Sequence, residues 1–388
     1  DETDPYSKTE VRLVIDRNIN EQLTLGATAL YSEEEIDYDG FNHEFDHIDR
    51  TRSAGSIYAS FDSGSITNKI KRSFSNTDRY DRNGWNKSFI GSRDVWNYTG
   101  QTIFNGANVT FGYEESTEEA DIDGQIKDYK ETAVISEVNY ALGKNSDISL
   151  AARRTSSKNY GDDTTYRLAA INRHQDELTS RLVVSSGFRA PSLYELFDSY
   201  YGNSTFTPET SLNAEIGLEK KLNETSEFSA TIFNNTVDNL IEFNNDTFVY
   251  EQYNGSTKTS GLELSSNLKV SDKFNLNANY TYTKAETGDV KAVRVPKHDI
   301  VLNIKNQFSE NFYSLLSVKV AKDIEDTVWP SNVQMPDYEV VDVSFTYDMN
   351  DKSSVYFKVQ NLADEKYETI KGYNTGGRQF FAGIRASF

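Results

Sequence analysis

The 388-residue chain contains no cysteine, which excludes disulfides, thiolate metal sites and cysteine nucleophiles. No run of residues approaches eighteen consecutive apolar positions, so a transmembrane helix is excluded as well. Basic residues are scarce, because 40 Lys and Arg stand against 60 Asp and Glu and the formal net charge is −20. Nucleic-acid binding needs a cationic surface and is therefore not expected. Any role in a membrane must depend on β-strands.

Aromatic residues are abundant in a chain that is otherwise polar. There are 24 Tyr and 22 Phe, although the mean hydropathy is only −0.65. Between Phe274 and Thr283 the even-numbered residues are apolar and the odd-numbered ones polar, which indicates a strand with one wet face. Alternation of this kind occurs in about nineteen segments. Examples are residues 23–31, 212–219, 228–234, 300–308, 312–320 and 380–388.

Short connections between these segments alternate with long polar ones. Short turns occur at Asn105-Gly106 and at Ser271-Asp272. The long connections are expected at about residues 33–50, 77–93, 118–127, 189–209, 285–294, 322–337 and 365–377. This arrangement is typical of outer-membrane barrels, whereas a soluble β-sandwich usually has shorter strands. The sequence therefore predicts an all-β fold, a transmembrane antiparallel β-barrel of about 19 strands, with tyrosines and phenylalanines in interfacial girdles.

Two groups of motifs then point to a known family. The first contains FRAPSLYELF at 188–197, TPETS at 207–211, VDNLI at 237–241 and GLE at 261–263. The second contains NLADEKYET at 361–369, GYN at 372–374, GGR at 376–378 and the terminal Phe388. Together they resemble TonB-dependent outer-membrane receptors over about residues 180–388. The second group looks most like the vitamin B12 (cobalamin) branch.

This resemblance implies a barrel of about 22 strands preceded by a plug and a TonB-engaging segment. Residues 1–388 read as the barrel portion alone, with the N-terminal plug and first strands missing. The implied location is the Gram-negative outer membrane. The implied partners are membrane lipid and lipopolysaccharide, TonB through the missing N-terminal region, the barrel-assembly machinery through the last strand, and a small-molecule ligand.

The expected function is TonB-energised uptake of a scarce nutrient, most of all cobalamin or a related corrinoid, and not enzymatic catalysis. A siderophore, haem or zinc receptor of the same family is the first alternative. A passive porin-like channel is an alternative of a different class.

Aromatic residues are candidates for ligand contact because they could stack on a flat macrocycle. The candidates are Tyr194, Phe197, Tyr200, Tyr201, Phe206, Trp85 and Tyr373. The alternative for the 189–209 loop is that Pro191, Leu193 and Phe197 simply pack it against the barrel wall.

Carboxylates at alternate positions in the first long connection suit Ca²⁺, which prefers hard oxygen ligands. The resemblance to cobalamin receptors also implies calcium-ordered loops. The candidate calcium ligands are Glu35, Asp37, Asp39, Asp78 and Asp81. A solvated acidic loop is the alternative.

The segment His43-Glu44-Phe45-Asp46-His47 matches the H-E-x-x-H pattern of zinc proteases. Zinc hydrolysis requires this pattern on a helix, and here it lies between period-two strands, so catalysis is not expected. Adventitious binding of a divalent metal by His43 and His47 is the remaining interpretation.

Overall fold

The computed structural model describes residues 5–39, 45–82, 87–175, 177–244, 247–328 and 331–387. Over these ranges twenty strands belong to one sheet, and three further pairs of short strands form separate two-stranded sheets. Among the described residues there is one short helix, α1 (Leu193–Phe197). In this part of the chain no helix is long and apolar enough to cross a membrane. The predicted all-β fold is confirmed, and the predicted strand number is close to the observed one.

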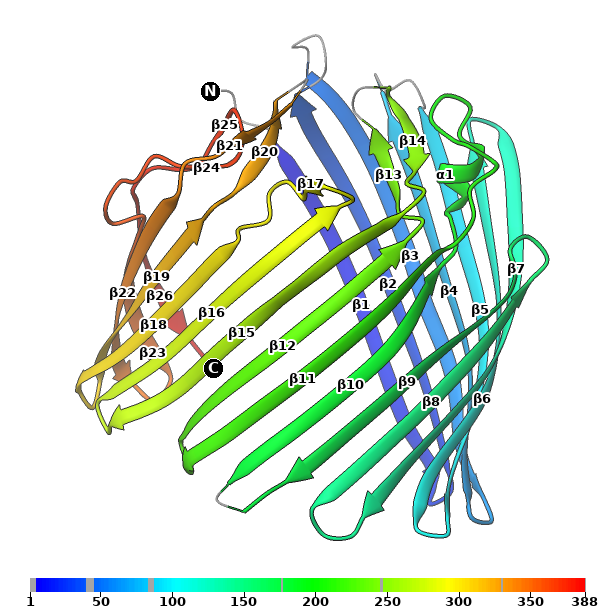
Figure 1. The fold of residues 1–388 in the computed structure, drawn as a ribbon, viewed down its shortest axis with the longest axis horizontal. Coiled ribbons are helices and arrows are strands. Elements are labelled where there is room, and N and C mark those ends of the chain that lie inside the picture. Colours follow the sequence, from blue (N-terminus) through cyan, green and yellow to red (C-terminus); the bar gives the residue numbers. More distant parts are fainter. Residues whose placement is uncertain are drawn as a thin grey trace. The chain divides into compact units, whose positions relative to one another are not determined.

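The chain divides into two compact units, of which the first comprises residues 1–168, 185–210 and 239–253. Neighbouring strands from β1 to β8 pair in sequence order, always antiparallel. In Figure 1 these strands run from blue to green. They are β1 (Tyr6–Asn20), β2 (Leu23–Asp39), β3 (Phe45–Ser63), β4 (Ile66–Asp81), β5 (Ser88–Phe104), β6 (Ala107–Ile122), β7 (Gln125–Leu142) and β8 (Ser146–Ser157). The unit also holds α1 and the hairpin of β13 (Ile241–Asn244) and β14 (Val249–Gln252).

The second unit comprises residues 169–184, 211–238 and 254–388. Strands β9 (Gly161–Arg173), β10 (Leu178–Arg189) and β11 (Glu209–Asn223) contribute residues to both units. Its long strands are β12 (Ser226–Asp238), β15 (Ser256–Ser271), β16 (Phe274–Thr287), β18 (His298–Ser309), β19 (Phe312–Lys322), β22 (Tyr338–Asn350), β23 (Ser353–Gln360) and β26 (Gln379–Ala386). Short strands in its connections are β17 (Val290–Lys291), β20 (Glu325–Val328), β21 (Ser331–Gln334), β24 (Glu368–Ile370) and β25 (Tyr373–Asn374).

Most of the long strands have one face with exposed apolar side chains. On β11 the side chains of Leu212, Ile216 and Leu218 are exposed, as the period-two pattern predicts. Ile232 on β12 is 64% exposed, and its cross-strand neighbour Leu262 lies on the same face. An exposed apolar surface this extensive marks a membrane or binding interface.

Two of the predicted long loops are strands instead. Residues 118–127 form the ends of β6 and β7, joined by the two-residue turn Asp123-Gly124 with φ values of 49° and 86°. Positive φ at both positions is the requirement of a type I′ hairpin, and this turn was missed because Asp and Glu residues are frequent in the sequence before it. The predicted hairpin at Asn105-Gly106 has the same geometry and is confirmed.

The acidic segment beginning at Glu33 is the second correction, because it continues strand β2 rather than forming a loop. Cross-strand pairing with β3 extends to Asp39. Glu34 is 3% exposed and pairs with Arg50 of β3, so its charge is compensated within the sheet. Basic residues on the neighbouring strand allow the acidic run to remain extended, which the sequence of a single strand does not show.

Candidate functional site

The connection between β10 and β11 begins with the short helix α1. Ser192 is its N-cap: the Ser192 hydroxyl accepts a hydrogen bond from the Glu195 N–H, and the Glu195 carboxylate accepts one from the Ser192 N–H. Leu193 is 1% exposed and packs with Ala120 and Ile122 at the end of β6. The helix is thereby fixed against the ends of β6 and β7 that the Asp123-Gly124 turn joins. This agrees with the alternative that Leu193 packs the loop against the barrel wall.

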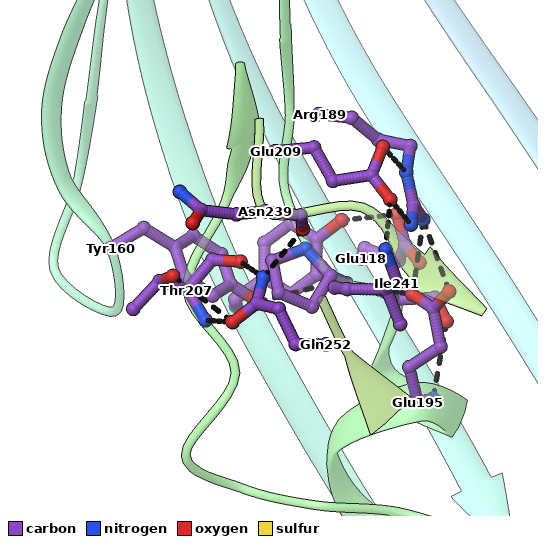
Figure 2. A network of polar contacts seen from close by, with 12 residues as sticks. Glu118, Tyr160, Arg189, Glu195, Thr207, Glu209, Asn239, Ile241 and Gln252 are labelled. Carbon is purple, nitrogen blue, oxygen red and sulfur yellow. Dashed lines mark hydrogen bonds and ion pairs between the residues drawn. The ribbon is translucent and has the colours of Figure 1, made fainter. Parts of the chain in front are cut away.

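Arg189, the last residue of β10, holds two carboxylates together at the base of this connection (Figure 2). The Arg189 Nε donates to Glu209 Oε2 at 2.8 Å, and Nη1 donates to Glu195 Oε2 at 3.0 Å. Glu209 also accepts from the Ile241 N–H at 2.8 Å. The side chains of Glu195 and Glu209 are only 11% and 10% exposed. One arginine therefore ties together the end of β10, helix α1, the start of β11 and the start of β13.

A second polar lock joins the same loop to the β13–β14 hairpin. The Gln252 side-chain amide donates to the carbonyls of Thr207 and Asn239, and its oxygen accepts from the Thr207 N–H (Figure 2). The Tyr250 N–H donates to the Tyr201 carbonyl at 2.9 Å. All hydrogen-bonding groups of the Gln252 side chain except one acceptor position are thus used to hold loop backbone.

Ionisation of this cluster follows from its burial and pairing. Burial alone would raise the pKa of Glu209, but the hydrogen bonds from Arg189 and from the Ile241 N–H lower it below its usual value. Hydrogen bonding to Glu209 in turn raises the pKa of Arg189. Burial, together with the nearby acids Glu131, Glu118 and Glu195, raises the pKa of Tyr160 to about 12. At neutral pH the Arg189 guanidinium and the Glu209 carboxylate are therefore both charged, and Tyr160 is a neutral phenol whose hydroxyl donates to the Pro191 carbonyl.

Aromatic side chains of the same loop and hairpin, together with Phe89 of β5, form a continuous series of edge contacts. Tyr194 lies between Phe89 and Tyr250, with ring centroids 5.9 Å and 6.2 Å away. Phe243 contacts Tyr250 at 5.3 Å and Tyr201 at 5.7 Å. Aromatic pairs favour this edge-to-face geometry, which makes the cluster a stiff platform.

The structure places the predicted ligand contacts in three different environments. Phe206 is 8% exposed and packs with Leu196 and Ile241, so its ring is part of the loop's own core. Tyr200 is 54% exposed at the edge of the platform. Tyr373 is 69% exposed on β25, in the second unit, and Trp85 lies outside the described residues. Ligand contact by these residues stays a prediction.

Three further exposed aromatic residues on or beside the β13–β14 hairpin were not singled out from the sequence. Phe243, Phe248 and Tyr253 are 37%, 57% and 40% exposed. They belong to the same unit as the platform, and Phe243 is part of its aromatic chain. Phe243 lies in the short run IEFN, Phe248 lies between this run and the run VYEQ, and Tyr253 directly follows VYEQ. These runs could have indicated a hairpin that presents aromatic residues.

Two of the residues predicted to bind metal, Asp37 and His47, are engaged with protein groups. Asp37 pairs with His47 Nδ1, and His47 Nε2 lies 2.9 Å from Asp49 Oδ1. Asp49 is in turn paired with Arg82 at 3.0 Å. Hydrogen bonding to Asp37 and Asp49 raises the pKa of His47. His47 lies on strand β3 and not on a helix, so the protease geometry is absent there, and His43 lies outside the described residues.

The remaining carboxylates do not converge on one point. The strand register places Asp78 on the face of Glu35 and Asp37, whereas Asp81 lies on the opposite face, where it accepts a hydrogen bond from the Tyr38 hydroxyl. Asp39 lies on β2, and its side chain is outside the description. Within the described ranges no three His, Asp or Glu side chains are grouped so that they could hold a metal ion. The calcium site stays a prediction.

Comparison with known proteins gives a consistent family. The family model described as "TonB dependent receptor-like, beta-barrel" matches residues 2–362. The chain is 26% identical over 236 residues to the vitamin B12 transporter BtuB of Vibrio cholerae, which covers 60% of this chain and 38% of that protein. It is also 26% identical over 284 residues to the iron-regulated outer membrane virulence protein of Vibrio cholerae, covering 65% of this chain and 44% of that protein. The chain thus spans less than half the length of these curated relatives.

Solved structures agree on the fold. The siderophore receptor PirA from Acinetobacter baumannii superposes with a TM-score of 0.84 at 15% identity, covering 99% of this chain and 71% of that one. The ferric enterobactin receptor of Pseudomonas aeruginosa gives a TM-score of 0.83 at 18% identity, covering 99% of this chain and 70% of that one. At these identities the likeness establishes the fold alone.

Proposed function

Because the chain belongs to the TonB-dependent receptor-like β-barrel family, we propose that it forms the barrel of an outer-membrane receptor for energised uptake of a corrinoid such as cobalamin. The family places the chain in the outer membrane, with the apolar strand faces toward lipid. Neither the family nor its relatives are enzymes.

The observation that carries the proposal is the aromatic platform that Arg189 helps to hold in place. It consists of loop 190–208 and the β13–β14 hairpin, both held in place by the contacts of Arg189 and Gln252. Its exposed aromatic side chains include Tyr200 and Phe248. A ligand that docks on a preorganised aromatic surface loses less affinity to ordering of the protein, and flat macrocycles match such a surface.

Choice of a corrinoid rests on sequence likeness and charge. The match to a vitamin B12 transporter supports it. The net charge of −20 disfavours capture of strongly anionic ferric catecholates by long-range attraction. A siderophore receptor is the second candidate, supported by the equally identical iron-regulated relative.

Equilibrium dialysis with radiolabelled cyanocobalamin, using the folded 388-residue chain in detergent micelles, tests the proposal. We expect saturable binding that unlabelled cyanocobalamin displaces and ferric enterobactin does not. Tyr200→Ala is expected to weaken binding about two- to tenfold, since stacking on one aromatic ring contributes about 0.5–1.5 kcal/mol. The matched control is Tyr140→Ala, an exposed tyrosine of β7 near a short turn, which should bind like the wild type.

Displacement by ferric enterobactin alone would favour the siderophore receptor over the corrinoid receptor. Loss of binding in both tyrosine variants would remove the platform from the explanation.

A further inference from the structure

The second unit has a hollow of about 510 Å³ on the apolar face of its strands. This volume falls within the range of roughly 300–1,000 Å³ found for small-molecule sites. The hollow extends over β11, β12, β15, β16 and β18, which Figure 1 shows in green to yellow.

Small side chains create this hollow. The cross-strand register places Phe228 beside Ser266 and Ser266 beside Ala278. The next row contains Ala230, Leu264 and Tyr280. Ala230, Ser266 and Ala278 therefore form a low floor, and the larger neighbours form its walls.

The two ends of the hollow differ in chemistry. At one end Tyr280 is fixed by His298, because its hydroxyl lies 2.9 Å from His298 Nδ1 and the two rings are stacked. At the other end lies Lys220, three residues before the end of β11. A lysine at the border of an apolar surface can extend its ammonium group to the interface, where lipid phosphates lie.

Depth in the membrane follows from the turns. The hollow lies two to five residues from strand ends that are joined by short turns, as counted for Phe228, Ser266 and Ala278. At roughly 3.3 Å per residue this is a distance of about 7–17 Å along the strands. In outer-membrane barrels the short turns are periplasmic. The hollow therefore faces the hydrocarbon of the periplasmic leaflet, and Lys220 lies close to the headgroups of that leaflet.

We propose that this hollow binds one acyl chain of a glycerophospholipid from the periplasmic leaflet, with its phosphate near Lys220. The lining is apolar apart from Lys220 and a few hydroxyl and amide groups, so it suits a hydrocarbon chain better than a sugar or a nucleotide. Continuity with the lipid-facing surface gives membrane lipid direct access, and the positive charge complements a phosphate. The proposal is independent of ligand uptake, because lipid binding at this face requires none of the platform residues.

Native mass spectrometry of the chain, extracted in mild detergent from membranes, tests the proposal. We expect the wild type to retain one phospholipid. Ala278→Phe fills the floor and should reduce the lipid-bound fraction at least tenfold. The matched control is Ala214→Phe, an exposed alanine of β11 on the same apolar face but outside the hollow, which should retain the lipid. Lys220→Gln should lower retention of phosphatidylglycerol at least threefold.

Equal retention by the wild type and Ala278→Phe would overturn the proposal, as would absence of lipid from the wild type. Retention of lipid A instead of a phospholipid would place the occupant in the opposite leaflet and refute the assignment. A dimer that Ala278→Phe dissociates would identify a second copy of the chain as the occupant. Heat-dependent mobility on gels reports whether each variant is folded. If Ala278→Phe does not fold, Ser266→Leu is used in its place to fill the floor of the hollow.

Discussion

Removal of the Arg189 guanidinium tests how the platform is held. In Arg189→Gln the carboxylates of Glu195 and Glu209 lose their common partner while they remain nearly buried. Loss of one partner of a fully buried ion pair costs about 3–5 kcal/mol, whereas an exposed pair contributes about 0–1 kcal/mol. The Arg189 side chain is 44% exposed, so solvent screens part of the interaction. We expect a cost near 2 kcal/mol for local opening of the platform.

Hydrogen–deuterium exchange measures this local opening directly. A cost of about 2 kcal/mol corresponds to roughly 30-fold lower protection. The loss should be confined to residues 190–208 and 239–244, because Arg189 contacts α1 and Glu209, and Glu209 contacts Ile241. The control is Arg154→Gln, which removes an exposed ion pair with Asp162 and should change protection less than threefold. Protection that falls less than threefold in Arg189→Gln, or equally in the loops of the second unit, would refute the role given to this arginine.

Two further predictions concern the other loops. Asp326 is fully buried and accepts hydrogen bonds from Arg294 Nε and from the Lys371 and Thr327 N–H groups. The variant Asp326→Asn should therefore destabilise the connections that contain β17 and β24 by about 1–3 kcal/mol. Limited proteolysis at residues 361–378 should be at least fivefold faster, and the exposed control Asp289→Asn should be cleaved like the wild type. The raised pKa of His47 means that its stabilising charge is fully present below about pH 6.5 and is lost as the pH rises through the folded-state value. Hydrogen exchange at residues 45–49, corrected for intrinsic rates, should therefore show lower protection at pH 8.5 than at pH 6, and an unchanged pH dependence in His47→Gln would contradict this.

The strands could be predicted because their signal is local. In β16 the alternation of apolar and polar residues from Phe274 onward reflects a pleat that has a period of two wherever the strand lies. Asn105-Gly106 likewise requires only its own two residues to form a type I′ turn. The capping box at Ser192 and Glu195 is also a local pattern, because Ser and Glu three residues apart mark the start of a helix, but no helix was predicted there.

The partners of polar side chains could not be predicted, since they come from distant parts of the chain. The Glu33 to Glu35 run was predicted to be a loop because its sequence does not show that Arg50 lies beside Glu34 on the neighbouring strand. Asp37 was predicted to be a calcium ligand, and its hydrogen bond to His47 of the neighbouring strand could not be predicted. In both cases the charge of an isolated segment gives no information on whether a cation from another strand compensates it.

The sequence by itself determined most of the strands, their apolar faces, most of the short turns and the family, because each depends on periodicity or on contiguous motifs. Only the tertiary structure decided which aromatic residues are buried and which are presented: Phe206 belongs to the core of the platform, whereas Tyr200 and Phe248 are exposed at its surface. The same holds for the hollow at Ala278, whose small floor residues come from three strands. The register of the strands and the packing of the loops decide which side chains are neighbours in space. A single sequence does not specify the register or the loop packing.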